Sequence, residues 1–234
     1  MRERSRNVTQ AVTSELIEAS HGTDGSLYDL WKSGALVDLL EIPDGVNNEI
    51  IGGKYVVSPT PTVPHACILQ DISDAFARAS VGDPQFAWTC LQVVSLRQES
   101  VEDQYIPDLV VLLKEMRTAA RKAAVRGLMP DEIEMAVEVT SPGGAGRDRP
   151  PTTAHRRARK QRRTKWNGYA AIEIPYYLLV DRSPKAAKTT LYSIPDRGAG
   201  AYLHKESWEF GETLHLPEPF DIEIETTEWE PWWL

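Results

Sequence analysis

Apolar residues along this chain recur with the period of a helix in some stretches and with that of a strand in others. Over residues 65–79 the apolar side chains follow the 3.6-residue period, which predicts an amphipathic helix. Similar spacing recurs over 27–40 and predicts another helix, although Gly34 interrupts it. Helical patterns also cover part of 114–131 and all of 166–172. Four helical segments are therefore expected.

Shorter runs rich in Val, Ile and Leu lie between these helices and predict β-strands. Residues 48–58 predict a hairpin, because two apolar runs flank the turn residues Gly52 and Gly53. Further strands are predicted over 86–96, 105–113, 133–142 and 174–181. From residue 189 onwards, alternating apolar and polar residues predict a C-terminal β-meander.

Length and composition favour a single domain. A chain of 234 residues with 41% apolar residues can bury a sizeable core, and mixed folds of this length usually form one unit. Residues 1–24 are polar and weakly periodic, so we expect a flexible N-terminal arm there. The α/β (α+β mixed) domain is expected to occupy residues 25–234.

Cysteine usage and hydropathy favour a cytoplasmic protein. Cys67 and Cys90 are the two cysteines, and neither belongs to a Cys-x-x-Cys pair, which excludes a disulfide framework and a structural zinc site. No apolar segment follows the charged residues 1–7, so no secretory signal is expected. The longest apolar run is far shorter than the roughly 20 residues of a membrane span, so we expect no membrane association.

The charges are distributed unevenly along the chain. The formal net charge is −8, yet seven of the 26 Lys and Arg residues fall within positions 156–165. A basic stripe in an acidic chain favours contact with nucleic-acid phosphates and a marked dependence on salt. The alternative is a solvated helix face or loop. The candidate contact residues are Arg156, Arg157, Arg159, Lys160, Arg162 and Arg163.

Two predicted strands each carry one acidic residue, Asp108 and Glu138. A buried carboxylate is costly unless it is paired or binds a cation. If Leu113 faces Ile133 in an antiparallel pair, Asp108 faces Glu138 with about 5 Å between their backbones. Adjacent like charges repel, so this pair calls for a counter-charge, most simply a divalent metal ion. The alternative is two strand-end acids that face solvent.

Glu49 and Lys165 complete a set of residues suited to phosphodiester hydrolysis. Carboxylates bind one or two Mg²⁺ ions, which polarise the phosphate and acidify a bound water. A lysine neutralises the charge that builds on phosphorus, or orients the attacking water. Glu49 would add a metal contact or act on the water as a base. The alternatives are a solvated Glu49 and a surface Lys165.

Several of these residues belong to motifs that follow one another in a fixed order. The motifs are Pro107-Asp108, 137–142, Asp148, Lys165, Tyr169 and 175–181, preceded by 49–59 and His65. This ordered set resembles the family of "putative restriction endonucleases" within the PD-(D/E)XK nuclease superfamily. The resemblance runs from about residue 28 to the end of the chain.

The resemblance implies a restriction-endonuclease-like fold, in which a central mixed β-sheet is flanked by helices. It implies Mg²⁺ dependence, with Mn²⁺ able to substitute, DNA as the substrate and a homodimer. It also implies that Asp108 and Glu138 are metal ligands and that Glu49 is the amino-terminal acidic member of the site. His65 and Tyr169 are accessory candidates, and the alternatives are a locally bonded histidine and a packing tyrosine.

The chain departs from the wider superfamily in the position of its lysine. Two residues after the second acid, where the superfamily has lysine, this chain has Thr140. In the subgroup that it resembles, the following helix supplies the lysine four residues before a tyrosine, as Lys165 precedes Tyr169 here. Asp148 and Lys165 lie seventeen residues apart, much farther than in that family, which indicates an inserted basic segment near 149–164.

These observations predict a metal-dependent endonuclease that hydrolyses DNA phosphodiester bonds, in which Lys165 stabilises the charged transition state. One alternative is a catalytically degenerate nuclease-fold protein that binds nucleic acid or a protein partner. Another is an interaction domain whose acids are surface residues, because a fold alone does not determine function. Asp148 is expected to cap the next helix. Trp229, Trp232 and Trp233 predict a hydrophobic lid or a dimer contact.

Overall fold

The computed structural model describes residues 16–17, 29–30, 33, 35, 47–58, 60–96, 103–125, 127–151 and 163–233. The expected arm over 1–24 and the helix predicted over 27–40 lie almost wholly outside these residues. Of the basic stripe, Arg163 is described, whereas Arg156, Arg157, Arg159, Lys160 and Arg162 lie outside the described residues. The division into an arm and one domain stays a prediction.

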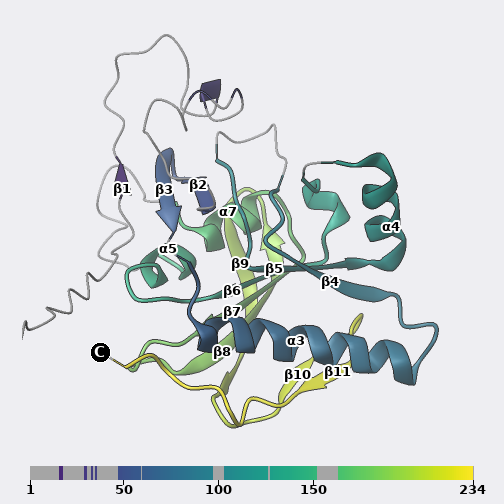
Figure 1. Cartoon of the computed structure of the whole chain (residues 1–234). Helices are drawn as coiled ribbons and strands as arrows, with labels where there is room; N and C mark the ends of the chain where they lie inside the picture. Colours follow the sequence, from purple (N-terminus) through teal and green to yellow (C-terminus); the bar gives the residue numbers. More distant parts are fainter. Residues whose placement is uncertain are drawn as a thin grey trace, which may run out of the picture.

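A six-stranded mixed sheet forms the centre of the molecule (Figure 1). Its strands, in spatial order, are β4 (Trp88–Gln92), β5 (Leu109–Leu113), β6 (Met135–Val139), β7 (Tyr176–Asp181), β8 (Lys188–Asp196) and β9 (Ala201–Glu209). Strands β6 and β7 pair in parallel, and every other neighbouring pair is antiparallel. The predicted mixed sheet flanked by helices is confirmed.

Both faces of this sheet are covered, so the inner strand β5 is apolar along its whole length. In β5, Leu109 and Val111 pack into one core cluster, whereas Val110 and Leu112 pack into the other. Successive side chains of a strand point to opposite faces, which is why a continuous apolar run is needed here. The pattern of β5 therefore follows from burial on two sides.

One face of the sheet is covered by α3 (Val63–Gly82) together with the ribbon of β10 (Leu214–Leu216) and β11 (Ile222–Ile224) (Figure 1). Pro64 lies in the first turn of α3, where its missing N–H leaves no helical hydrogen bond unmade. The predicted apolar stripe is buried: Ile68, Leu69, Ile72, Ala75 and Phe76. The amphipathic helix predicted over 65–79 is confirmed.

The opposite face carries a second small sheet and the helix α7 (Lys165–Ala171). The small sheet contains β1 (Leu16–Ile17), β2 (Asn47–Ile51) and β3 (Lys54–Ser58), with β3 in the middle. Gly52 and Gly53 turn the predicted β2–β3 hairpin, and both have positive φ angles, of 61° and 70°, which glycine adopts easily. The short helix α5 (Ala145–Asp148) contacts α7.

The remaining elements refine two predictions. Helix α4 (Lys114–Ala123) and the 3-10 turn η1 (Pro130–Glu132) form within the linker that was expected to be partly helical. The C-terminal strands form as predicted, but β8 and β9 extend the central sheet, whereas β10 and β11 make a separate ribbon that packs against α3. Among the described helices, none combines the length and apolar character that crossing a membrane requires.

Candidate active site

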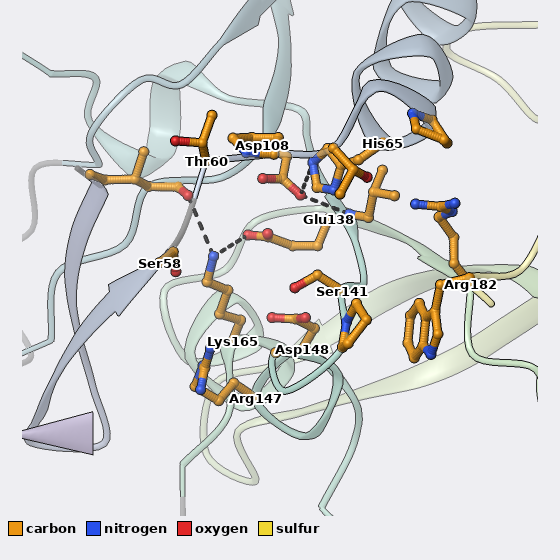
Figure 2. Close-up of a pocket in the computed structure, with 18 of the residues that line it drawn as sticks. Ser58, Thr60, His65, Asp108, Glu138, Ser141, Arg147, Asp148, Lys165 and Arg182 are labelled. Atoms are coloured by element: carbon orange, nitrogen blue, oxygen red, sulfur yellow. Dashed lines mark hydrogen bonds and ion pairs between the residues drawn. The ribbon is translucent and has the colours of Figure 1, made fainter. Parts of the chain in front are cut away.

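A cavity of about 590 Å³ opens where the central sheet, the β2–β3 hairpin and the N-terminal ends of α3 and α7 meet (Figure 2). Its wall includes all four predicted catalytic residues, which come from four separate parts of the chain: Glu49, Asp108, Glu138 and Lys165. The accessory candidate His65 also lines it. The fold therefore brings the predicted set together.

The pairing of β5 with β6 brings Asp108 and Glu138 to neighbouring positions. Leu109 faces Val137, which is the register that follows from the assumed pairing of Leu113 with Ile133. Asp108 precedes Leu109, and its Oδ2 accepts a hydrogen bond of 2.8 Å from the Val139 amide, one residue beyond Glu138. The predicted register is confirmed, and both carboxylates line the same cavity.

Lys165 links two of the acidic residues. Its Nζ lies 2.9 Å from Glu138 Oε1 and 2.9 Å from Glu49 Oε1 (Figure 2). Thr164 precedes it as the N-cap of α7, and its hydroxyl accepts a hydrogen bond from the Asn167 amide at 3.4 Å. Burial alone would lower the pKa of Lys165, but the neighbouring carboxylates raise it well above the usual value, so the amine is charged.

The two carboxylates that contact Lys165 are each held by a further hydrogen bond. The Glu49 carboxylate accepts a hydrogen bond of 2.7 Å from the Ile106 amide, two residues before Asp108. The Tyr169 hydroxyl donates a hydrogen bond of 2.5 Å to Glu138 Oε1, the same oxygen that contacts the lysine. Tyr169 is therefore a buried packing residue, which was the alternative stated for it, and it also bonds directly to the site through Glu138.

His65, in the first turn of α3, approaches the other acid. Its Nε2 lies 3.3 Å from Asp108 Oδ2, a close contact without the alignment of a good hydrogen bond. Burial alone would raise the pKa of Asp108, but His65, Lys165 and the amide of Val139 together lower it. Asp108 is thus an ionised carboxylate at neutral pH.

Asp148 joins Glu49, Asp108 and Glu138 in this cavity, although the sequence pattern did not predict its position there. It ends α5 instead of capping the next helix, it is buried, and its carboxylate faces the cavity (Figure 2). Burial, together with the charges of Asp108 and Glu49, raises its pKa to about 7, against the opposing effect of Lys165. Its place among the ordered motifs was the only indication in the sequence of a role at this site.

Negative charge exceeds positive charge in this part of the cavity. Burial raises the pKa of Glu138 well above its usual range, and the charges of Asp108 and Asp148 raise it further, although Lys165 opposes them. A cation would relieve this repulsion. Among the described residues, no three His, Cys, Asp or Glu side chains converge as a metal-binding group. Mg²⁺, however, commonly takes only one or two carboxylates, with waters and substrate phosphates. Asp108 and Glu138 fit that donor set.

Other parts of the cavity wall have a different chemistry, supplied by Arg147, Arg182, Trp232 and Trp233. Trp229, by contrast, is buried in the core, where its ring contacts Phe210 and its Nε1 donates to Asp71 Oδ2 at 2.9 Å. The prediction of a lid or dimer contact is wrong for Trp229, because the indole fills the space between α3 and the C-terminal ribbon. For the other two tryptophans it stays a prediction.

Arg163 is the one predicted phosphate contact among the described residues. Its half-exposed guanidinium lies 3.8 Å from the buried carboxylate of Asp103. The backbone of Arg163 also packs closely against Gly52, where a Cβ would lie 3.2 Å from the arginine carbonyl oxygen. Phosphate binding by the stripe stays a prediction.

A mixed sheet that carries two adjacent acids and a nearby lysine in one cavity is the arrangement of restriction-endonuclease-like nucleases. Residues 36–228 match the family model described as "Uma2: Putative restriction endonuclease", so the chain belongs to this family. Membership supports nuclease activity on a nucleic acid. No curated protein matches the sequence.

A solved structure supports the same fold. The crystal structure of a "putative nuclease belonging to DUF820" from Anabaena variabilis is similar, with a TM-score of 0.55. The two proteins share 14% sequence identity, and the similarity covers 81% of this chain and 93% of that chain. At this level of identity the likeness concerns the fold alone.

Proposed function

We propose that this protein is a Mg²⁺-dependent endonuclease that hydrolyses DNA phosphodiester bonds. The observation that carries the proposal is the meeting of Asp108, Glu138 and Lys165 in one cavity, although they come from three separate elements. Membership of the family supports the nuclease activity. DNA is the substrate that the family description favours, since a restriction endonuclease acts on DNA.

Lys165 is the group that stabilises negative charge on the phosphate. Its amine is protonated and held by two carboxylates, so it does not serve as a base. A fixed cation aimed at the phosphate oxygens favours the transition state, in which charge accumulates there. Glu49 positions this amine, and the amide of Ile106 positions Glu49 in turn.

Asp108 and Glu138 would hold the metal ion, and Mn²⁺ would substitute for Mg²⁺. The ion polarises the phosphate and acidifies a bound water when it is present. Both carboxylates are oriented by other groups of the chain, because the Val139 amide donates to Asp108 and the Tyr169 hydroxyl donates to Glu138. Glu49 remains a candidate for a third contact. We also propose a homodimer, which the family resemblance implies.

A second candidate is a protein of the same fold that binds nucleic acid without cleaving it. The specific observation in its favour is that Lys165 contacts Glu138 and Glu49 with its single amine. If this ion pair keeps metal out of the site, the carboxylates would be structural. The two candidates differ in whether the protein cleaves DNA.

The test is cleavage of supercoiled plasmid by purified protein in Mg²⁺, in Mn²⁺ and in EDTA. Wild type is expected to nick the plasmid with either metal and not in EDTA. Asp108→Asn and Glu138→Gln keep the shape of each side chain but remove its charge, and each is expected to lower the rate by at least about 100-fold. Lys165→Met is expected to lose a similar factor.

Matched controls are Glu206→Gln and Lys205→Met, because both residues are exposed on β9. Both variants should cleave at the wild-type rate. Cleavage that survives in Asp108→Asn and Glu138→Gln would rule out the proposed site. Salt-sensitive DNA binding without cleavage by wild type would favour the second candidate.

A further inference from the structure

Part of the cavity wall combines one arginine with two tryptophans, and none of the proposed catalytic steps uses them. Arg182, Trp232 and Trp233 all line the cavity. Figure 2 shows Arg182 on the far side of the Glu138 carboxylate from Lys165. Arg182 directly follows β7, whereas the tryptophans belong to the C-terminal segment.

Arg182 is a buried cation that forms no ion pair within the part of the chain that the structure describes, and the charge of the Glu230 carboxylate offsets only part of the effect of its burial. The residue is 5% exposed, and burial lowers the pKa of its guanidinium. Its Nε donates a hydrogen bond of 3.0 Å to the carbonyl oxygen of Glu230, a neutral group. A buried charge of this kind is costly unless an anion meets it. An anionic group of a ligand in the cavity would do so.

The C-terminal segment is fixed to the domain on either side of this arginine. The amide of Trp232 donates to the carbonyl oxygen of Arg182 at 3.0 Å, and the guanidinium returns a bond to Glu230. The buried Trp229 anchors the start of the segment through Asp71. Trp233, however, is 83% exposed at the mouth of the cavity. The indole of Trp233 is thus exposed to solvent although the backbone next to it is fixed by hydrogen bonds.

An aromatic ring beside an arginine is the chemistry that recognises an unstacked nucleotide. A base stacks on the ring, while the guanidinium contacts the phosphate. The cavity of about 590 Å³ lies within the size range of small-molecule sites. A nucleotide in a duplex cannot present its base face to an indole unless it leaves the stack. The wall therefore favours nucleotides that are already unpaired.

We propose that Arg182, Trp232 and Trp233 form a subsite for one unpaired nucleotide next to the phosphate to be cleaved. The preferred substrate is then single-stranded DNA or an unpaired strand end. Trp233 stacks on the base, Arg182 binds its phosphate, and Trp232 forms the wall between them. This inference rests on the proposed nuclease function for its location, but its binding test does not depend on cleavage.

The test compares the binding of a fluorescently labelled single-stranded oligonucleotide with that of the blunt duplex of the same sequence, by anisotropy. All proteins carry Glu138→Gln and are kept in EDTA, so cleavage does not interfere. The single strand is expected to bind at least about tenfold more tightly than the duplex. Adding Trp233→Ala should weaken single-strand binding by about tenfold and leave duplex binding unchanged. Adding Trp233→Phe should retain most of the affinity.

A second variant tests the arginine with a measurement that a purely structural role would not change. Arg182→Gln should reduce the slope of log affinity against log salt by about 0.7 for the single strand, the contribution of one phosphate contact. Leu203→Ala is the matched control for Trp233→Ala, because Leu203 is also apolar and exposed, at 66%, and lies on β9. Its affinity should equal that of the background protein.

The subsite is overturned if Trp233→Ala binds the single strand as tightly as the background protein, whether or not its oligomeric state changes. It is also overturned if single strand and duplex bind equally well. Plasmid cleavage by wild type together with either of these results would leave the nuclease proposal intact. Selective binding of the single strand that depends on Trp233, without any cleavage, would support the subsite and reject the nuclease.

Discussion

Replacing Lys165 with methionine should destabilise the protein strongly, and more so at high pH than at low pH. The side chains of Lys165, Glu49 and Glu138 are all buried, and Nζ lies 2.9 Å from a carboxylate oxygen of each acid. Removing one member of a buried ion pair leaves the other charges unpaired, which costs about 3–5 kcal/mol. The free energy of unfolding of Lys165→Met should therefore fall by about that amount at pH 8.

The pH dependence follows from the carboxylates that remain. Burial already raises the pKa of Glu138 above its unfolded value, and loss of Lys165 raises it further. An acid whose folded pKa exceeds its unfolded pKa binds more protons in the folded state, so its contribution to stability declines as the pH rises. Protonation of Glu138 as the pH falls relieves the unpaired charge. The stability deficit of Lys165→Met should thus be smaller at pH 5.5 than at pH 8.

Urea unfolding followed by tryptophan fluorescence at both pH values measures this deficit. The matched control is Lys205→Met, an exposed lysine on β9, which should change stability by no more than about 0.5 kcal/mol at either pH. A deficit below about 1 kcal/mol at pH 8, or one that grows toward pH 5.5, would show that Lys165 does not compensate the buried acids.

Three further outcomes are expected. Gly168→Ala should lower the free energy of unfolding, measured by urea titration, by about 1–3 kcal/mol, because the added Cβ would collide with the buried hydroxyl of Tyr105. The control is Gly146→Ala, which should be neutral or stabilising because the space around that Cβ is open. Asp181→Asn should cost about 1–3 kcal/mol near neutral pH, because it removes the charge and leaves a single oxygen to accept the two 2.6 Å bonds that Arg149 donates. Burial opposes ionisation of Asp181, but these bonds lower its pKa. The difference in free energy of unfolding between wild type and Asp181→Asn should therefore shrink as the pH falls below about 4. Chemical denaturation at several pH values measures this difference. Mg²⁺ at a hundred times its Kd should raise the free energy of unfolding of wild type by about 2.7 kcal/mol and so raise its melting temperature. Excess EDTA should return the melting temperature to its original value. An unchanged melting temperature at every Mg²⁺ concentration would contradict metal binding to the folded state.

The sequence was sufficient to predict the parts of the site that depend on strand register and helix period. Asp108 and Glu138 come together because the two predicted strands pair in the antiparallel register that was assumed from the sequence, with Leu109 opposite Val137. Lys165 and Tyr169 lie one helical turn apart, so both reach Glu138 from α7. These relations are local to one element or to one pair of elements.

The parts that were missed depend on contacts between distant segments. Nothing near Asp148 in sequence indicates that it is buried beside Lys165, because α5 reaches the site only through its packing on α7. Arg182 follows a strand, where an arginine is usually solvated; the C-terminal segment buries it. Trp229 lies near the end of the chain but fills the core against α3. Periodicity carries no information about such long-range packing.

The parallel pairing of β6 with β7 divides the molecule into two halves that could be made as separate polypeptides. Strands β4, β5 and β6 are consecutive on one side of the junction, and β7, β8 and β9 are consecutive on the other. The first half supplies Glu49, Asp108 and Glu138, and the second supplies Lys165. A chain interrupted between residues 151 and 163 would thus yield two pieces, each lacking part of the machinery. Their reassociation, through the pairing of β6 with β7 and the packing of the C-terminal ribbon on α3, would restore it, which makes this fold a candidate for a split nuclease switched on by bringing its fragments together.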